Sequence, residues 1–540
     1  MLGCSLSALG GYFPDMTTTF DDLRRHNVIE RIWQKDHTVW KPDVEEIANR
    51  LGWLDSPDMM RDSLAELSEF SYVLSRDGFK EVVLLGMGGS SLGAEVLKQT
   101  FGSLQGHPKL TVLDSTVPDR IRMVRDSIDP RETLFMVASK SGTTIEPLSL
   151  FQYFREMVET RLGAIEARRN FVAITDSDTP LAKQAVDDGF RRLFLNPSDI
   201  GGRYSVLSYF GLVPASVMGL DIKSLLDSSV MMKTRCRRYE DLSRNPGVVL
   251  GAIMGHSVLA GRDKLTLVTS PSIRSFGLWV EQLLAESTGK EGTGIVPIIG
   301  EPLVDPSYYG DDRLFIHLRL AEDDNVDIDT AIDKIRVSGF PVIRLEMQDR
   351  YDLGAEFFRW EFATAVSGII LGVQPFDQPD VDKSKKATDG VLEEFLISGK
   401  LKDEELITSV PELLAKTGRG RYLAILAYLN ESPELDKDVF NVRRRMLQKY
   451  GIATTFGYGP RYLHSTGQLH KGGLNSGLFL QVIQPYEWDT SIPGKSYSFG
   501  SLAGAQALGD LKTLLNLHRT VARISLEGNR TLSEVLGVLR

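Results

Sequence analysis

The sequence predicts an α/β protein with mostly parallel sheets, covered by helices on both faces and flanked by helical segments at each end. From about residue 81, short apolar runs alternate with amphipathic stretches long enough for helices. Two of the apolar runs lead directly into turns rich in glycine and hydroxyl residues. The 540 residues, 42% hydrophobic and 25% charged, fit a globular chain of two or three domains.

Residues 1–72 are expected to form an N-terminal helical segment. Helices are predicted over residues 20–35, 43–51 and 56–72 from the spacing of their apolar positions. Asp43 and Ser56 are expected as N-caps, because their side chains can accept hydrogen bonds from the first free N–H groups of a helix.

A first α/β unit is expected over residues 73–235. Its predicted strands are 82–85, 110–113, 134–138 and 171–174, and its predicted helices are 91–100, 119–126, 146–163 and 180–188. Strands that alternate with helices in this way are typical of a parallel sheet.

A second α/β unit is expected over residues 236–500. Its predicted strands are 265–268, 295–299, 314–318 and 342–345, and its predicted helices are 246–261, 275–288, 329–337 and 353–371. The polar stretch 378–435 is expected to be a surface excursion, after which 453–456 and 479–483 return to the sheet. Residues 501–540 are expected to be a helical C-terminal segment with a long helix over 502–517.

Composition excludes several classes of protein. The formal net charge of −10 argues against general nucleic-acid binding. The two cysteines, Cys4 and Cys236, cannot form a disulfide framework, which favours a reducing compartment and a cytoplasmic protein. The chain has no run of 18 apolar residues, and its first residues lack the basic start of a signal peptide, so no membrane span is expected.

The two hydroxyl-rich turns are the strongest functional signal. Residues 86–93 read GMGGSSLG and residues 139–146 read SKSGTTIE, and each turn lies between a predicted strand and a predicted helix. Backbone N–H groups at a helix start bind anions, so the two turns predict a shared phosphate, with Lys140 as a fixed positive charge beside it. For the first turn, a tight glycine turn without a ligand is an equally good interpretation. The second turn has more hydroxyls than a helix cap needs.

Two further segments hold candidate catalytic side chains. Gly201 and Gly202 would let a ligand approach Arg203, which could stabilise a developing oxyanion, although a surface salt bridge is the simpler interpretation. Gln282 and Glu286 lie four positions apart and therefore share a helix face. Glu286 could serve as a general base, but exposed helical glutamates are common enough to favour a solvated side chain.

A glycine-rich segment near the C-terminus contains two histidines. Residues 458–473 include His464 and His470, whose spacing is poor for a helical metal site and which no cysteine or carboxylate joins. No metal is therefore expected. A histidine that transfers protons is the better functional hypothesis, and a hydrogen-bonded loop histidine is the structural alternative.

Taken together and in this order, these segments resemble the glucose-6-phosphate isomerase family, and most closely the branch found fused to transaldolase in some bacteria. The resemblance extends from about residue 82 to residue 511 and includes a Phe-Asp-Gln-Pro segment at 376–379. It implies two sugar-isomerase (SIS-type) αβα sandwich domains. It also implies substrate contacts at Gly89, Ser90, Ser139, Lys140, Ser141, Thr144, Gly202 and Gln282.

The resemblance implies reversible isomerisation of glucose 6-phosphate and fructose 6-phosphate by a cytoplasmic homodimer without a cofactor. His464 would open the sugar ring, Glu286 would move a proton between C2 and C1, and Arg203 would stabilise the enediolate. Family members place a lysine near the start of their C-terminal helix, and residues 498–506 contain none. Lys495 and Lys512 flank that stretch, and the sequence does not decide between them.

Two alternative functions remain compatible with the sequence. Mannose 6-phosphate could also be a substrate, which would require only a different presentation of C2 to the base. A non-catalytic sugar-phosphate sensor would keep the phosphate turns, but it would not need Glu286, Arg203 and His464 together.

Overall fold

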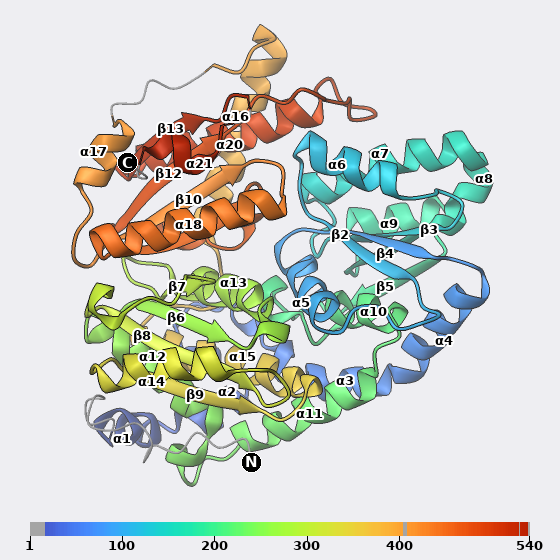
Figure 1. Ribbon diagram of the computed structural model, residues 1–540. Helices are drawn as coiled ribbons and strands as arrows, with labels where there is room; N and C mark the ends of the chain where they lie inside the picture. Colours follow the sequence, from blue (N-terminus) through green and yellow to red (C-terminus); the bar gives the residue numbers. More distant parts are fainter. Residues whose placement is uncertain (1–16, 403–407, 529, 538–540) are drawn as a thin grey trace.

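A computed structural model describes residues 17–402, 408–528 and 530–537, which form three parallel sheets covered by helices (Figure 1). Every strand pair within these sheets is parallel, which confirms the predicted α/β class. No helix in the described ranges is both long and apolar enough to cross a membrane.

The first sheet forms the first unit and has the strand order β2-β1-β3-β4-β5. Its strands are β1 (Glu81–Leu85), β2 (Lys109–Leu113), β3 (Thr133–Ala138), β4 (Phe171–Asp176) and β5 (Arg192–Asn196). Helices α5 (Leu92–Phe101), α6 (Pro118–Ser127), α7 (Ile145–Leu162), α9 (Pro180–Asp187) and α10 (Tyr209–Val217) accompany it. The four predicted strands are confirmed. The prediction missed β5, whose burial is irregular, as expected for an edge strand.

The second sheet forms the second unit and has the order β7-β6-β8-β9. Its strands are β6 (Lys264–Thr269), β7 (Val296–Ile299), β8 (Arg313–Leu320) and β9 (Val342–Met347). Helices α11 (Ile222–Cys236), α12 (Pro246–Leu259), α13 (Phe276–Thr288), α14 (Val326–Val337) and α15 (Leu353–Leu371) belong to this part of the chain. Helix α15 packs against α11, α12 and α13, so it lies at the centre of a helical layer.

A third sheet, which the sequence did not predict, forms the C-terminal unit (residues 408–528 and 530–537), with the order β11-β10-β12-β13. Its strands are β10 (Tyr422–Tyr428), β11 (Ala453–Tyr458), β12 (Gly477–Ile483) and β13 (Thr520–Ser525). The strands expected at 453–456 and 479–483 exist, but they pair with β10 and β13 rather than with the second sheet. The expectation that residues 378–435 form a surface excursion is therefore wrong. Strand β10 lies within this stretch and is buried along its whole length.

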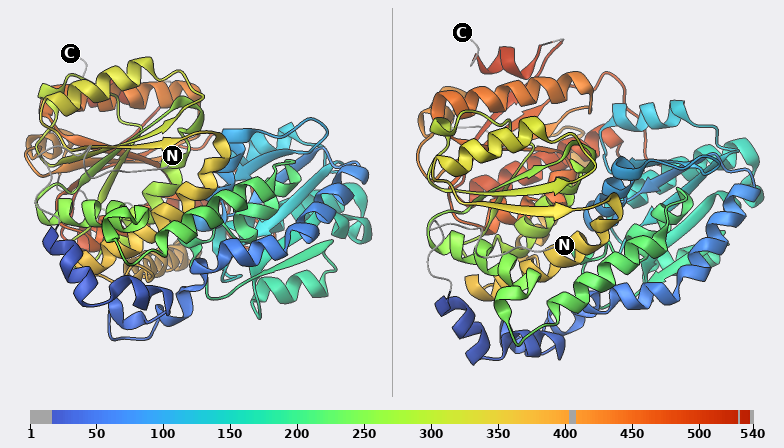
Figure 2. Two further views of the ribbon diagram at one scale, coloured as in Figure 1. Left: turned by 90° about the horizontal axis from the view of Figure 1, so that it is seen from below. Right: turned by 60° about the horizontal axis from the view of Figure 1, so that its bottom comes forward.

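The three sheets share one pattern of strand order. Each places the second of its strands at an edge, followed by the first, third and fourth, and the first sheet adds β5. The second and third sheets meet where β7 lies beside β11. Figure 2 shows the second and C-terminal units next to each other, with the first unit to one side.

The remaining helices differ in part from the prediction. The expected helix 20–35 is two helices, α1 (Thr17–Arg25) and α2 (Val28–Trp33), separated at Asn27, whose φ of 49° is left-handed. Over 43–51 only a single 3-10 turn, Ala48–Arg50, is present, so that helix and the Asp43 cap were wrong. The expected helix 56–72 is α3 (Ser56–Asp62) and α4 (Leu64–Arg76), and Ser56 begins α3 rather than capping it. Residues 1–16, including Cys4, lie outside the described residues.

Two long helices join the C-terminal unit to the rest of the molecule. Helix α16 (Pro379–Ser398) packs along α20 (Phe499–Asn516), and α20 confirms the predicted helix at 502–517. A Cβ atom at Gly509 would lie 2.6 Å from Thr388 Oγ1, so the two helices touch there. Helices α17 (Val410–Ala415), α18 (Pro433–Tyr450), α19 (Gly467–Gly472) and α21 (Leu532–Leu536) complete the unit. The expected domain boundaries stay predictions.

Candidate functional site

The first glycine turn lies against the Gly-Gly-Arg segment. It follows β1, which pairs with β3 where the strand order of the first sheet reverses, and ligands bind at such positions in doubly wound sheets. A Cβ atom at Gly89 would lie 2.1 Å from the carbonyl oxygen of Gly202, so the two backbones touch. Ser90 is buried in the same turn. Gly89, Ser90 and Gly202 therefore lie together.

The second turn presents hydroxyl groups at the end of β3. Ser139 Oγ lies 2.9 Å from Thr144 Oγ1, and Ser141 Oγ lies 2.9 Å from Thr143 Oγ1. Ser141, Thr143 and Thr144 line a cavity of about 220 Å³. The rest of its lining is Ile145, Glu146, Val381, Ser384, Lys385, Thr388, Asp389, Leu463, His464 and Gln506. Ser141 Oγ also accepts from the backbone N–H of Thr143 at 3.3 Å. These hydroxyls can turn to an anion without leaving a charged partner.

Lys140 does not line this cavity. Its ammonium contacts the carboxylate of Asp176 at the end of β4 and lies 3.0 Å from the carbonyl oxygen of Ser198. The positive charge expected beside the phosphate turn is therefore paired within the protein. The lysine connects the turn to Asp176 and Ser198. Its backbone remains part of the turn.

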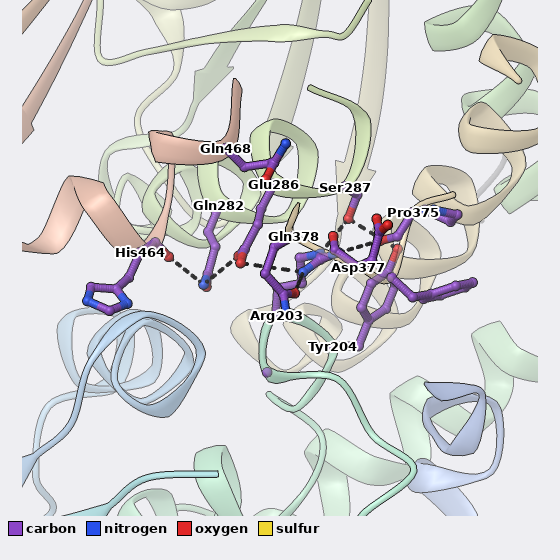
Figure 3. A network of polar contacts seen from close by, with 12 residues as sticks. Arg203, Tyr204, Gln282, Glu286, Ser287, Pro375, Asp377, Gln378, His464 and Gln468 are labelled. Carbon is purple, nitrogen blue, oxygen red and sulfur yellow. Dashed lines mark hydrogen bonds and ion pairs between the residues drawn. The ribbon is translucent and has the colours of Figure 1, made fainter. Parts of the chain in front are cut away.

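Glu286 occupies the face of α13 that the sequence predicts. Gln282 Nε2 donates to Glu286 Oε2 at 3.1 Å, as residues four positions apart on a helix allow. On the other side, Arg203 Nη1 lies 3.5 Å from Glu286 Oε1. The carboxylate is nearly buried between an amide and a guanidinium (Figure 3).

Arg203 is fixed almost completely by hydrogen bonds. Its guanidinium donates to Ser287 Oγ at 2.8 Å, Gln378 Oε1 at 3.0 Å, and the carbonyl oxygens of Pro375 and Asp377 at 2.6 and 2.9 Å. Three of these acceptors belong to or border the Phe-Asp-Gln-Pro segment, which thus holds the arginine (Figure 3). A rigid arginine beside Glu286 can stabilise charge without reorganisation.

Lys290 supports this arrangement and was not singled out from the sequence. Its ammonium donates to the carbonyl oxygen of Gln374 at 2.6 Å, and to the carbonyl and carboxylate oxygens of Asp377 at 2.5 Å each. Burial, together with the nearby charge of Arg203, lowers the pKa of Lys290 to about 7 despite the pairing with Asp377. Lys290 therefore stabilises the Phe-Asp-Gln-Pro segment, and that segment accepts the hydrogen bonds of Arg203.

His464 connects the two groups of side chains. Its Nε2 lies 2.9 Å from Glu146 Oε1, and its backbone carbonyl accepts a hydrogen bond from Gln282 Nε2 at 2.7 Å. In Figure 3 the imidazole points away from Gln282. Gln506 Nε2 also donates to Glu146 Oε1, at 2.7 Å. Burial opposes ionisation of Glu146, but the charge and hydrogen bond of His464 outweigh it and lower the pKa of Glu146.

Contacts around His464 hold its segment in place. Arg461 donates to both carboxylate oxygens of Asp114, at 2.8 and 2.7 Å. Gln468 donates to the carbonyl oxygen of Gly289 at 3.0 Å and to Asp380 Oδ2 at 2.7 Å, so it connects three segments and does not line the cavity.

The second histidine of this segment, His470, has a different environment. It is buried against the aromatic rings of Tyr462 and Phe479, and burial lowers its pKa well below the usual value. The proton-transfer hypothesis therefore rests on His464 alone.

A lysine does reach the cavity, but from a helix that the sequence analysis did not consider. Lys385 on α16 is part of the lining, with its ammonium 3.1 Å from Asp382 Oδ1. Lys495 and Lys512 are not part of the lining, and Lys512 lies 3.8 Å from Glu394. The sequence feature that could have pointed to Lys385 is its position shortly after the Phe-Asp-Gln-Pro segment at 376–379.

The candidate site residues therefore form two clusters that meet at His464. Arg203, Gln282 and Glu286 form the first cluster and do not line the cavity. The hydroxyl turn, Glu146 and Lys385 form the second. Among the described residues, no group of three or more histidine, cysteine, aspartate or glutamate side chains could hold a metal ion.

Comparisons with known proteins identify relatives of this chain. A family model described as phosphoglucose isomerase matches residues 62–296. A glucose-6-phosphate isomerase of Symbiobacterium thermophilum is 31% identical over 383 residues, covering 62% of this chain and 85% of that protein. A probable glucose-6-phosphate isomerase of Methanococcus maripaludis is 28% identical over 399 residues, covering 67% of this chain and 87% of that protein.

A solved structure shares the fold. The crystal structure of a glucose-6-phosphate isomerase from Chlamydia trachomatis aligns with a TM-score of 0.60 at 18% identity, over 71% of this chain and 87% of that chain. At this identity the likeness concerns the fold. On the strength of the sequence relatives, the chain belongs to the phosphoglucose isomerase family.

Proposed function

We propose that this protein interconverts glucose 6-phosphate and fructose 6-phosphate without a cofactor, as the names of its relatives suggest. The observation that supports this most directly is the position of Glu286. Its carboxylate lies between Gln282 and Arg203, beside the segment that contains His464. A nearly buried carboxylate next to a fixed arginine suits proton abstraction beside a carbonyl group.

Ring opening requires a base at the anomeric hydroxyl and an acid at the ring oxygen. Nε2 of His464 lies 2.9 Å from Glu146 Oε1, so this nitrogen is held by the carboxylate and the other ring nitrogen, Nδ1, is the one that can act on the sugar. We assign His464 to this step. Lys385, at the same cavity, can donate to the ring oxygen.

Isomerisation then moves one proton between neighbouring carbons. Glu286 takes the proton from C2 of the open aldehyde form, and the electron pair of that bond forms the enediolate. Arg203 stabilises the negative oxygen, the hydroxyl proton moves from O2 to O1, and Glu286 returns the carbon-bound proton to C1 to give the ketose. Reversing these steps converts fructose 6-phosphate back, so one carboxylate serves both directions.

The hydroxyl turn would bind the phosphate. Ser141 and Thr144 line the cavity, and Ser139 is paired with Thr144. We propose that the neighbouring turn, with Gly89, Ser90 and Gly202, also binds the phosphate. We propose that Lys140 supports the hydroxyl turn through its contact with Asp176. A phosphate fixed at one end makes the proton transfer effectively intramolecular.

A coupled assay with fructose 6-phosphate and purified protein tests the proposal. We expect turnover, together with incorporation of solvent deuterium at C2 of the product. Tight binding of the sugar phosphate without turnover would instead support a sensor. Parallel turnover of mannose 6-phosphate would establish dual specificity. The cytoplasmic location stays a prediction, supported by a buried free thiol at Cys236.

A further inference from the structure

Helix α16 presents a buried serine to the cavity beside the hydroxyl turn. Val381, Ser384 and Thr388 share one face of this helix, and all three line the cavity. Ser384 is 6% exposed, and its Oγ atom has no hydrogen-bond partner in the described part of the chain. A serine inside a helix commonly donates to the carbonyl oxygen four residues earlier or faces water. Ser384 does neither, so its hydroxyl is available to a ligand.

The same cavity contains a buried acceptor that lacks a donor. Oε1 of Glu146 is held by His464 at 2.9 Å and by Gln506 at 2.7 Å. Oε2 of the same carboxylate is also buried, and none of the described residues donates to it. An ionised carboxylate accepts hydrogen bonds and donates none, so this oxygen requires a donor from outside the protein.

Other polar groups of the lining already have partners within the protein. Ser141 Oγ lies 2.9 Å from Thr143 Oγ1, and the ammonium of Lys385 lies 3.1 Å from Asp382 Oδ1. Buried polar atoms without a partner are rare in folded proteins, so the hydroxyl of Ser384 and the free carboxylate oxygen are unusual here. Together they offer a ligand one donor and one acceptor.

The chemistry of these two atoms indicates which part of the substrate they contact. A phosphate dianion offers only acceptors, and the charge of Glu146 would repel it. An alcohol group can both donate and accept. We infer that Ser384 and Oε2 of Glu146 bind hydroxyl groups of the sugar chain, with Ser384 as a donor and the carboxylate as an acceptor. This inference rests on the proposed function and adds Ser384 to its substrate contacts.

Sorbitol 6-phosphate provides the test, because it has the hydroxyls and the phosphate of the open sugar chain but no carbonyl group to isomerise. Isothermal titration calorimetry measures its affinity for the full-length wild type and for Ser384→Ala. We expect the substitution to weaken binding by about threefold to tenfold, as the loss of one hydrogen bond should. Ser398→Ala, at an exposed position on the same helix, is the matched control and should bind like the wild type.

Two further measurements separate this role from others. Inorganic phosphate, which has no sugar hydroxyls, should protect the wild type and Ser384→Ala equally against thermal unfolding. Without ligand, the melting temperature of Ser384→Ala should equal or exceed that of the wild type, because the substitution removes a buried hydroxyl that has no partner. A lower melting temperature would show that the hydroxyl has a structural partner and would overturn the inference.

The inference would also be wrong if Ser384→Ala bound sorbitol 6-phosphate as tightly as the wild type, if it lost the same affinity for inorganic phosphate, or if the wild type did not bind sorbitol 6-phosphate. None of these measurements requires turnover. A wild type that binds sorbitol 6-phosphate through Ser384 but does not convert fructose 6-phosphate would overturn the proposed function alone.

Discussion

The first unit and the C-terminal unit contribute to the site in different ways. The first unit presents two short contiguous turns at the carboxyl ends of adjacent strands, β1 and β3. The C-terminal unit contributes His464, whose position depends on contacts with residues far away in the sequence. Its partner Glu146 is 318 positions away.

Because of this difference, we expect the first unit to act mainly in substrate binding, and the junctions between units to act in the chemical steps. Turns that follow strands bind anions through local geometry, so changes there should weaken substrate binding. The histidine and the base lie where units meet, and changes there should affect the chemical steps. The following substitutions test this division.

The largest effect is expected for Glu286→Gln. The substitution keeps the size of the side chain but removes the general base, so kcat should fall by about a hundredfold or more with little change in KM. Steady-state kinetics with fructose 6-phosphate measure both constants. The matched control is Glu281→Gln on the same helix, where the carboxylate is influenced by Arg443 and Arg461 instead of Arg203. A fully active Glu286→Gln protein would exclude this residue as the base.

His464→Gln should give a smaller and more selective loss. Isomerisation of glucose 6-phosphate should slow by about tenfold to a hundredfold, because ring opening loses its base. Proton exchange on erythrose 4-phosphate, which cannot close a stable ring, should be nearly unchanged if the compound binds. His26→Ala, at an exposed position just after α1, is the control. Equal losses with both substrates would assign His464 to the proton transfer itself.

Substitutions in the hydroxyl turn should mainly affect binding. Ser141→Ala combined with Thr144→Val should raise KM by about tenfold or more, because hydrogen bonds to a charged group contribute about 1.5–3 kcal/mol each. Lys140→Met should raise KM less, since its ammonium is paired with Asp176. Thermal protection by inorganic phosphate should decrease in the same order. A larger effect of Lys140→Met would show that the lysine turns to the phosphate when substrate binds.

The accuracy of the sequence analysis follows the same division. The parallel first sheet and both of its turns were predicted, because each is encoded within a few consecutive residues. The pairing of Gln282 with Glu286 was also predicted, because helix periodicity places them on one face. Local patterns therefore carried these conclusions.

What could not be predicted depended on contacts between distant segments. The pairing of His464 with Glu146 and the clamp formed by Lys290 have no local signal. Strand β10 was missed because polar segments surround it in the sequence, although the fold buries it completely. The lysine was sought on α20, whereas α16 brings Lys385 to the cavity.

The smallest effect concerns stability rather than activity. Glu281, on α13, is buried where the second unit meets the C-terminal unit, and burial raises its pKa from 4.5 to about 8 against the opposing charges of Arg443 and Arg461. Below pH 4.5 the folded and unfolded carboxyls are both protonated, and the neutral group contributes its full stability. Between pH 4.5 and 8 the unfolded carboxyl loses its proton first, so stability should fall as pH rises through this range.

Glu281→Gln removes this titration. Its melting temperature should therefore exceed that of the wild type by an increasing margin from pH 5 to pH 8, reaching on the order of a few degrees. Melting curves recorded by differential scanning calorimetry across this range measure the margin. Glu156→Gln, at an exposed position on α7, should show no such trend. A margin for Glu281→Gln that stays constant with pH would mean that this carboxyl is already ionised in the folded protein, stabilised by the two arginines of the C-terminal unit.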